Sequence, residues 1–369
     1  MGSYSSISVG NVVIDSTKNY LSMGYFLFCY EDKKEKYRPE YKDKNYVLSR
    51  KLISVLSRLE LEGFTLKTAR KIIIDELRDS QCGISYNDFI QRLVTIDFSE
   101  KNPYGDIDNL LLGDNSLYYH FHPLALLRIL VDILKDKDVD ISLDYLELYR
   151  GGWIKRNFLP TKLSKFLILT EGKTDTEILK LSLQKIYPYI SPYFSFANTE
   201  ESPFGGTTNL VKFLKGLNSI DYENNVIAIF DNDTAGNAAI LEVPQHMNTN
   251  IKVMSLPKHK KFSKFNTIGV SDKMVKKNIN GSGVAIECFL DIPEDAFIRW
   301  VSYDEKLKKY QGCFDTNSKK KYYNKFISEI KNIETEYDYS MLTFLWDEII
   351  KKAVQMSEKS LLSQYHTRY

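Results

Sequence analysis

Four carboxylates stand directly after two short apolar runs of the sequence, and their types and spacing suit metal-ion chemistry. Glu171 and Asp175 follow the first run, and Asp231 and Asp233 follow the second. Because Asp231 and Asp233 are two residues apart, their side chains point to the same face of an extended chain. Such a cluster repels itself unless a divalent cation neutralises it, and oxygen ligands suit Mg²⁺ or Mn²⁺ rather than zinc. The sequence therefore predicts a metal site built from these acids.

Glu287 follows a third apolar segment, at 284–286, and is a further candidate ligand. Each acid taken alone is also common at a turn or a helix cap. The combination is more specific, because TEGxxD follows one apolar run and DND-x-x-G follows another about 60 residues later. It favours a functional metal site over separate caps and turns.

The elements that must position these acids are short strands alternating with helices. Apolar runs without polar alternation predict strands covered on both faces, and their alternation with helices predicts a parallel sheet flanked by helices. In such sheets functional groups gather at the carboxyl ends of the strands, where the acids stand. The expected strands span 166–169, 226–230, 251–254 and 284–286, and the expected helices span 175–186 and the stretch from Gly206 to Leu217.

The region before residue 155 has a different pattern. Alternating Ile7 and Val9 with a turn at Gly10 and Asn11 predict a hairpin over 5–15, and residues 31–45 are charged enough to predict an exposed loop. Apolar periodicity predicts helices over 48–59, 66–77 and 123–134, and again from about 291, ending with 337–362. We therefore expect an α/β protein of three parts: a mostly helical α+β domain at 1–155, a domain with a parallel sheet at 160–292, and a helical extension at 293–369.

The composition of the 369 residues indicates a globular protein of the cytoplasm. With 43% hydrophobic and 27% charged residues, a mostly disordered chain is excluded. No run of about 18 apolar residues occurs and the first residues lack the parts of a secretion signal, so we expect no membrane partner. The four cysteines argue against a zinc ribbon and for a reducing compartment, since they are far apart and form no CxxC pair: Cys29, Cys82, Cys288 and Cys313.

Positive charge is concentrated locally, although the net charge is only +2. Residues 251–280 contain eight lysines and one acid. Such a cluster attracts a phosphate backbone, but a solvated lysine-rich loop has the same composition. The candidate nucleic-acid contacts are Lys173 in the first acidic motif and Lys258, Lys260, Lys261 and Lys264 after the strand expected at 251–254.

Residues 166–290 resemble a Toprim domain, the metal-binding module of topoisomerases, bacterial primases and OLD-family nucleases. The resemblance rests on FLILTEGKTDTEIL at 166–179 and VIAIFDNDTAGN at 226–237, while GVAIECFL at 283–290 is similar to the later glutamate-bearing strand of OLD-type members. MGSYSSISVGNVVIDSTKNY, LEGFTLKTAR, and the stretch from DNSLYYHFHPLALLRIL to LDYLELYRGGWI resemble the N-terminal domain of HEPN/Toprim proteins. Such proteins are associated with bacterial defence against phage and other invading nucleic acid.

The resemblance implies a nuclease that uses Mg²⁺ or Mn²⁺ to hydrolyse nucleic-acid phosphodiesters. It makes Glu171 the general acid/base and a metal contact, and Asp231 and Asp233 the magnesium ligands. It leaves Asp175 and Glu287 as ligands for a second metal ion. A lysine near the scissile phosphate is expected to add positive charge in the transition state, with Lys260 as the candidate.

Other activities of these families fit the sequence less well. HEPN ribonucleases use an arginine, then four to six residues, then a histidine, and none of the five histidines, among them His120 and His122, follows this pattern. The N-terminal domain is therefore expected to serve recognition or assembly. The cysteines cannot build the zinc module of a primase, and the roughly 80 residues after 290 are too few for a topoisomerase gate.

Several alternatives stay open at the level of the sequence. A sensor or regulatory subunit of a defence complex that binds nucleic acid or a nucleotide without cleaving it would use the same fold. DNA and RNA are equally open as substrates. Because the chain has no Walker A motif, it acts either alone or with a separate ATPase or another defence partner, and a homo-oligomer is equally open.

Overall fold

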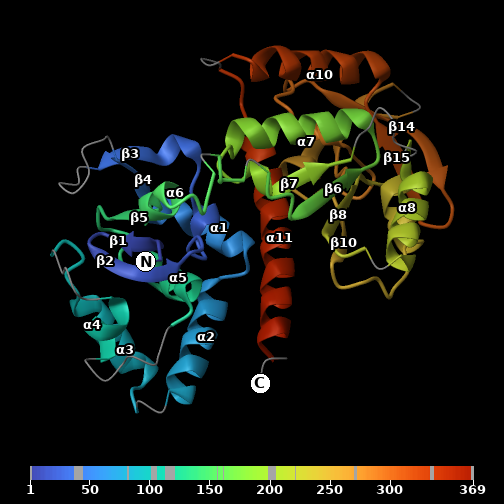
Figure 1. Cartoon of the computed structure of the whole chain (residues 1–369). Helices are drawn as coiled ribbons and strands as arrows, with labels where there is room; N and C mark the ends of the chain where they lie inside the picture. The colour runs from blue at the N-terminus through green and yellow to red at the C-terminus, as the bar shows by residue number, and fades with distance from the viewer. Residues whose placement is uncertain are drawn as a thin grey trace. The chain divides into compact units, whose positions relative to one another are not determined.

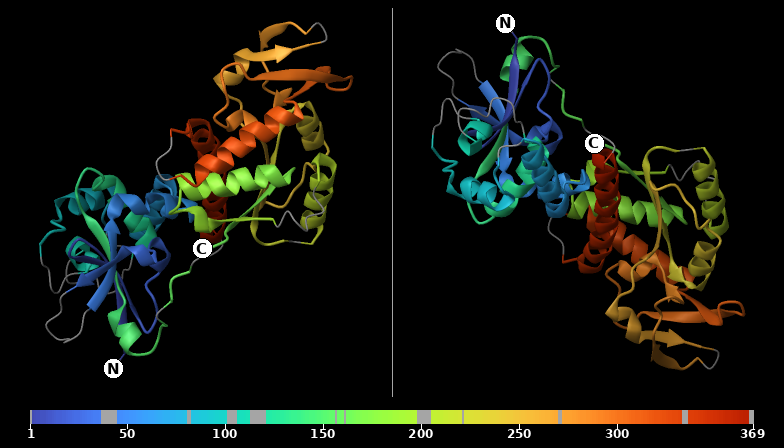
Figure 2. Two further views of the ribbon diagram at one scale, coloured as in Figure 1. Left: turned by 90° about the horizontal axis from the view of Figure 1, so that it is seen from above. Right: turned by 90° about the horizontal axis from the view of Figure 1, so that it is seen from below.

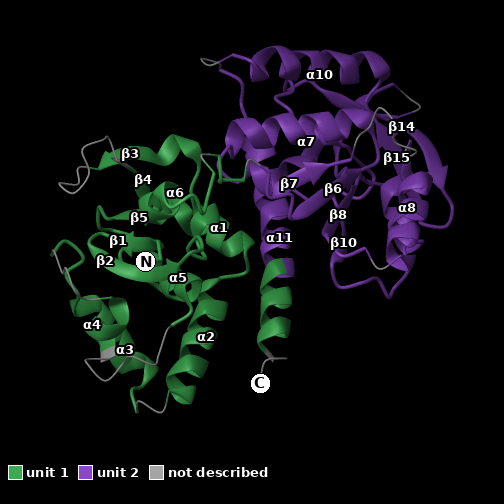
Figure 3. Ribbon diagram, in the orientation of Figure 1, with its two compact units in different colours: residues 1–161, 357–369 green, residues 162–356 purple. Residues whose placement is uncertain are grey.

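The computed structural model describes residues 2–36, 45–80, 83–100, 106–112, 121–155, 157–160, 162–197, 205–220, 222–269, 272–332 and 336–366. The chain divides into two units, coloured separately in Figure 3. Unit 1 contains residues 1–161 and 357–369, and unit 2 contains residues 162–356. The segment 293–369 is thus shared between the units, because helix α11 (Ser340–His366) begins in unit 2 and ends in unit 1. Cys82, His120 and residues 37–44 lie outside the described residues.

Unit 1 is built on a five-stranded antiparallel sheet in the order β2-β1-β5-β4-β3 (Figure 1). The expected N-terminal hairpin is confirmed. Its turn needs Gly10, which has a φ of 57°, and a Cβ there would stand 2.1 Å from the carbonyl oxygen of Phe98. The strands are β1 (Tyr4–Val9), β2 (Val12–Lys18), β3 (Lys33–Lys36), β4 (Asn45–Lys51) and β5 (Asp140–Asp144).

Six helices among the described residues accompany this sheet. The helix expected at 123–134 is confirmed as α5, which begins with Pro123 and buries eight of its residues. The helix expected at 66–77 is confirmed as α2, capped by the Thr65 side chain. The helices are α1 (Leu56–Leu61), α2 (Leu66–Asp79), α3 (Tyr86–Thr95), α4 (Ile107–Leu112), α5 (Pro123–Ile133) and α6 (Leu146–Arg150).

Two local predictions for unit 1 are wrong. The helix expected at 48–59 is strand β4 up to Lys51, followed by a 3₁₀ turn (Leu52–Val55) and the short α1. Leu48 lies opposite Leu143, a partner 95 residues away that local periodicity cannot reveal. Part of the expected charged loop is the exposed edge strand β3, whose lysines suit an edge open to water.

Unit 2 contains the expected parallel sheet, in the order β10-β8-β6-β7. The mixed α/β fold class, with a parallel sheet flanked by helices, is confirmed. The strands are β6 (Phe166–Thr170), β7 (Phe194–Phe196), β8 (Asn225–Phe230) and β10 (Ile251–Ser255). The helices that follow them are α7 (Lys173–Ile186), α8 (Thr207–Ser219) and α9 (Thr234–Leu241).

Helices cover both faces of this sheet. On one face, Leu210 and Leu214 of α8 pack against Ala228 of β8 in a buried cluster that includes α9. On the other face, Thr170 of β6 is hydrogen bonded to Thr176 of α7 at 2.6 Å. Helix α10 (Thr316–Ile330) runs beside α7 (Figures 1 and 2).

A second, mixed sheet in unit 2 has the order β12-β11-β14-β15. Its strands are β11 (Phe265–Ile268), β12 (Met274–Lys277), β14 (Phe297–Asp304) and β15 (Lys309–Cys313). The prediction that the chain is helical from about 291 is therefore wrong as far as residue 313. Few residues of β14 and β15 are buried, and the apolar residues of β14 do not alternate regularly with polar ones, so no period of two predicts these strands.

The prediction of a strand of the parallel sheet at 284–286 is also wrong. The two-residue strand β13 (Gly283–Val284) pairs antiparallel with β9 (Asn232–Asp233), outside the parallel sheet. Short 3₁₀ turns complete the described elements, at Tyr25–Leu27, Tyr30–Asp32, Ser191–Tyr193, Lys260–Lys264 and Ile286–Phe289. Among the described helices, none combines the length and the apolar character needed to cross a bilayer.

Candidate metal centre

Glu171 and Asp231 meet at the carboxyl edge of the parallel sheet. Strands β6 and β8 are neighbours, and Thr170 lies opposite Ile229, so the two strands end at the same level of the sheet. The Asp231 N–H donates a hydrogen bond of 2.9 Å to Glu171 Oε1. The two motifs that stand about 60 residues apart in the sequence are thus joined directly.

Asp175 lies in the first turn of α7, where Gly172 is the N-cap residue. A Cβ on Gly172 would stand 3.2 Å from Asp175 Oδ2, so glycine leaves room for the carboxylate. Burial raises the pKa of Asp175 to about 6, and the charge of Glu287 adds to the rise. Asp175 and Glu287 therefore face a common acidic region.

Asp233 has a structural role in this arrangement. Its Oδ1 accepts a 2.7 Å hydrogen bond from the Gly236 N–H and so caps helix α9, while Oδ2 accepts one of 2.5 Å from Gln311 Nε2. Gln311 also accepts a 2.9 Å hydrogen bond from the Ala235 N–H. Sequence reasoning missed Gln311, because it lies on β15 in a segment expected to be helical.

Glu287 is almost completely buried, at 5% exposure, on the 3₁₀ turn Ile286–Phe289 rather than at the end of a sheet strand. Its Oε1 is 3.5 Å from Lys319 Nζ. Its Oε2 has no hydrogen-bond partner among the described residues. A buried carboxylate oxygen without a donor is costly, and a cation would relieve that cost.

Lys319, on α10, is the cation that the structure places among these acids. Burial opposes its charge, but Glu287, Asp231 and Asp175 outweigh burial and raise the pKa of Lys319. Sequence reasoning missed it among three consecutive lysines. The signal was present, because Lys319 is three residues before Tyr322 and seven before Phe326, the buried residues of this helix.

Electrostatic repulsion is strong across the cluster. Burial, followed by the charges of Asp175 and Glu171, raises the pKa of Asp231 well above its usual range. Burial raises the pKa of Glu171 to about 7, and the charges of Asp233 and Asp175 add to the effect. Without a cation, Glu171 and Asp231 therefore bind protons at a higher pH than ordinary carboxylates do.

The donor set fits a hard divalent cation, since it consists of carboxylate oxygens with one buried oxygen unpaired. Even so, among the described residues no three His, Cys, Asp or Glu side chains are arranged to hold one ion. The physical reason is that Glu171 is turned to a backbone N–H and Asp233 to Gly236 and Gln311. Metal binding would require these side chains to exchange their present partners for the ion.

The lysines proposed as nucleic-acid contacts lie at the surface of unit 2. Lys258, Lys260, Lys261 and Lys264 are exposed and follow β10, a direct neighbour of β8. Lys173 is exposed at the start of α7. The lysine charge that favours ionisation of Glu171 and Asp175 is that of Lys319. The proposed catalytic role of Lys260 stays a prediction.

His122 packs as a structural residue of unit 1. Its backbone N–H donates to both carboxylate oxygens of Glu76 at 3.1 Å, and its ring lies 4.9 Å from that of Phe64. These contacts describe the packing of His122, and the expectation that the N-terminal domain is not catalytic stays a prediction.

The comparisons with known proteins bear on the N-terminal region. Residues 1–165 match the family model described as HEPN/Toprim N-terminal domain 1, which confirms the resemblance expected there. The match ends before the parallel sheet of unit 2, so the OLD-like Toprim resemblance stays a prediction. No curated protein and no solved structure matches the chain significantly. The chain therefore carries an HEPN/Toprim N-terminal domain, which indicates a nuclease-associated function.

Proposed function

We propose that this protein is a metal-dependent nuclease whose active site is the acidic cluster at the carboxyl edge of the parallel sheet. The observation that carries the proposal is the hydrogen bond from Asp231 to Glu171, which joins two acidic motifs beside Asp175, Glu287 and Lys319. A protein has little use for so many repelling carboxylates unless they serve chemistry or bind a cation.

The residues suggest a division of roles. Glu171, Asp175, Asp231, Asp233 and Glu287 would hold Mg²⁺ or Mn²⁺. When bound, the metal supplies an activated water and neutralises charge on the leaving oxygen of a phosphodiester.

Protons and phosphate would be handled by the chain's own residues. Glu171, whose pKa is raised to about 7, can take up and release a proton near neutral pH and so suits general acid/base catalysis. Lys319 provides positive charge beside the acids, where negative charge develops on the phosphate. Lys173, Lys258, Lys260, Lys261 and Lys264 would contact the backbone of the substrate farther from the reacting atoms.

The resemblance to HEPN/Toprim proteins extends the proposal to the biological role. We infer that the protein is an effector of bacterial defence in the cytoplasm, with the N-terminal domain serving recognition or assembly. Expression of the wild-type chain should then reduce phage plating. A chain with both Glu171→Gln and Asp231→Asn should give no protection, and equal protection by the two would contradict a nuclease effector.

A second candidate function rests on a specific observation. Asp233 is engaged by Gly236 and Gln311, and no three acids of the described residues hold one ion. A sensor that binds nucleic acid or a nucleotide without cleaving it would need no such ion.

The experiment that separates the two functions is a cleavage assay with the purified full-length chain. Single-stranded RNA, tRNA, single-stranded DNA and duplex DNA are each incubated with Mg²⁺, with Mn²⁺ or with EDTA. Cleavage of one polymer class that requires the metal supports the nuclease. Binding without cleavage under every condition supports the sensor and contradicts the nuclease.

A further inference from the structure

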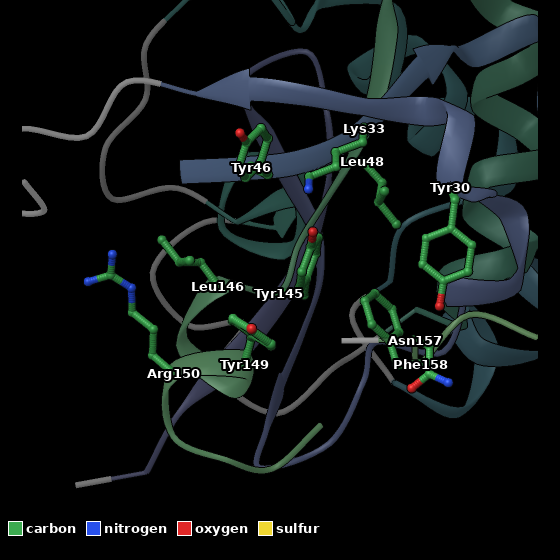
Figure 4. Close-up of a pocket in the computed structure, with 10 residues that line it drawn as sticks. All are labelled: Tyr30, Lys33, Tyr46, Leu48, Tyr145, Leu146, Tyr149, Arg150, Asn157 and Phe158. Carbon is green, nitrogen blue, oxygen red and sulfur yellow. The ribbon is translucent and has the colours of Figure 1, made fainter. Parts of the chain in front are cut away.

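Unit 1 contains a cavity in which half of the ten lining residues are aromatic (Figure 4). Its volume is about 790 Å³, within the range of roughly 300–1,000 Å³ that small-molecule sites occupy. Four of its ten lining residues are tyrosines, and we call it the tyrosine pocket: Tyr30, Tyr46, Tyr145 and Tyr149.

Three parts of unit 1 bring these rings together. Tyr30 begins the 3₁₀ turn Tyr30–Asp32, Tyr46 lies in β4, and Tyr145 and Tyr149 are the N-cap and a member of α6. The ring of Tyr145 packs against Phe158, with centroids 4.8 Å apart. In Figure 4, Tyr145 lies at the centre of the group, between Tyr46 and Tyr149 on one side and Tyr30 on the other.

Two of the tyrosines have exposed rings, and one of them, Tyr30, is held by a hydrogen bond. The Tyr30 hydroxyl accepts a 3.0 Å hydrogen bond from the backbone N–H of Leu159, a buried residue, and this bond holds the ring in place. Tyr30 is nevertheless 39% exposed and Tyr149 is 44% exposed. An exposed and oriented aromatic ring is a platform on which a planar ligand can stack.

The charged residues of the pocket wall are both cations. Lys33 Nζ lies 3.8 Å from the centroid of the Tyr46 ring, and Arg150 stands at the outer edge of the group in Figure 4. Lys34, the next residue of β3, points elsewhere and pairs with Asp140 at 3.0 Å. The strand therefore directs one lysine to the pocket and its neighbour to an acid.

Acids close to the pocket in sequence are engaged by other groups. Asp32 pairs with Arg50 at 3.1 Å, and Glu147 accepts a 3.0 Å hydrogen bond from the Tyr4 N–H. No carboxylate belongs to the ten lining residues. The pocket thus favours a ligand that is planar on one side and anionic on the other.

We propose that the tyrosine pocket binds a nucleobase that carries a phosphate group. The base would stack on Tyr30 or Tyr149, the phosphate would meet Lys33 and Arg150, and Asn157 in the wall offers an amide for the polar edge of the base. A proline-rich peptide also suits aromatic grooves, but it brings no negative charge to the two cations. This site lies in unit 1 and does not depend on the nuclease activity proposed for unit 2.

The test uses the full-length chain in EDTA, so that metal-dependent cleavage cannot occur. The probes are a short single-stranded oligonucleotide containing 2-aminopurine, whose fluorescence falls when it stacks, the same sequence as a duplex, and adenosine monophosphate. The variants are Tyr149→Ala and Lys33→Ala. Their matched controls are Tyr20→Ala, which removes a tyrosine that is 77% exposed, and Lys34→Ala, on the same strand as Lys33.

We expect binding of the single strand to quench the fluorescence. Tyr149→Ala should weaken the affinity by about 5- to 140-fold, the range that corresponds to loss of one stacked base. Lys33→Ala should lower the slope of log affinity against log salt by about 0.7. The two controls should bind like the wild type. If the monophosphate binds as tightly as the oligonucleotide, the ligand is a free nucleotide, and otherwise it is an unpaired nucleotide of a nucleic acid.

Three results would overturn the inference: variants that bind like their controls, a duplex that binds as tightly as the single strand, or a proline-rich peptide that binds where nucleotides do not. If the chain cleaves nucleic acid but shows any of these results, only the proposal that the tyrosine pocket binds a nucleotide is contradicted. A chain that binds through the pocket but never cleaves would contradict only the nuclease.

Discussion

Replacing Gly236 by alanine tests whether helix α9 approaches the Asp231 backbone as closely as the structure shows. Gly236 lies in the first turn of α9, and a Cβ there would stand 2.3 Å from the carbonyl oxygen of Asp231. It would also stand 3.1 Å from the Asp231 carbonyl carbon and 3.2 Å from its nitrogen. These are backbone atoms, so no side-chain rotation can relieve the overlap.

The size of the effect follows from these distances. Ordinary contacts of a Cβ begin at 3.4 Å, so the Asp231 carbonyl and the helix must separate by roughly 1 Å. A movement of that size disturbs the 2.9 Å hydrogen bond between the Asp231 N–H and Glu171. Overpacking of this kind costs about 1–3 kcal/mol, or a fall in Tm of roughly 2–12 °C for a unit of this size.

The assay is thermal unfolding of the full-length chain, followed by cleavage under the conditions found active for the wild type. Gly216→Ala is the matched control, because Gly216 lies inside α8 and an added Cβ would meet nothing within 4 Å apart from the adjacent backbone of its own helix. The control should be stabilised by about 0.5–1 kcal/mol, since alanine favours a helix over glycine. Equal stability and equal cleavage in Gly236→Ala and Gly216→Ala would refute the close approach at the site.

Three further predictions concern charge. In EDTA, stability should fall as pH rises from about 4.5 to 7, because the folded pKa of Glu171 is raised from 4.5 to about 7 and the folded state binds the proton more tightly. Glu171→Gln should reduce this loss of unfolding free energy by up to about 3 kcal/mol. If the variant and the wild type have the same pH profile of Tm, the raised pKa of Glu171 is contradicted. Lys319→Ala should lower the free energy of unfolding by about 1–2 kcal/mol, because it leaves the buried Glu287 carboxylate without its cation. The loss is smaller than for a fully buried pair, since the Lys319 side chain is 40% exposed. Denaturant unfolding measures this, and the control Lys320→Ala should change the free energy of unfolding little. Glu76→Gln should stabilise the chain at pH 8 but not at pH 5, because burial raises the pKa of Glu76 to about 7, and thermal melts at the two pH values check this.

The parallel sheet and its acidic edge were predictable because their signals are local. Strands β6 and β8 each contain a continuous apolar run, and Glu171 and Asp231 stand directly after them. The alternation of strands and helices predicts that β6 and β8 belong to one parallel sheet with their carboxyl ends at the same edge. Their direct pairing depends on tertiary structure, because β7 lies between them in the sequence and pairs with the other side of β6.

The remaining parts of the site depend on tertiary contacts that local sequence patterns do not predict. Asp233 accepts a hydrogen bond from Gln311, which lies on strand β15, and the residues of this strand show no apolar pattern. Glu287 stands on a 3₁₀ turn that pattern analysis mistakes for the end of a strand. Lys319 is selected from three neighbouring lysines only by the face that α10 turns toward the acids. In each case a tertiary contact, not local propensity, decides the position.

The most direct test of the central claim compares Mg²⁺-dependent cleavage by the wild type with that by Asp231→Asn. Asparagine keeps the shape and the backbone N–H that binds Glu171 but removes the charge that a metal requires. Glu305→Gln, an exposed change in the turn between β14 and β15, is the control. We predict that Asp231→Asn lowers the cleavage rate by at least about 10²-fold while Glu305→Gln cleaves like the wild type. Cleavage by Asp231→Asn at the wild-type rate and with the same Mg²⁺ dependence would show that the chemistry lies elsewhere.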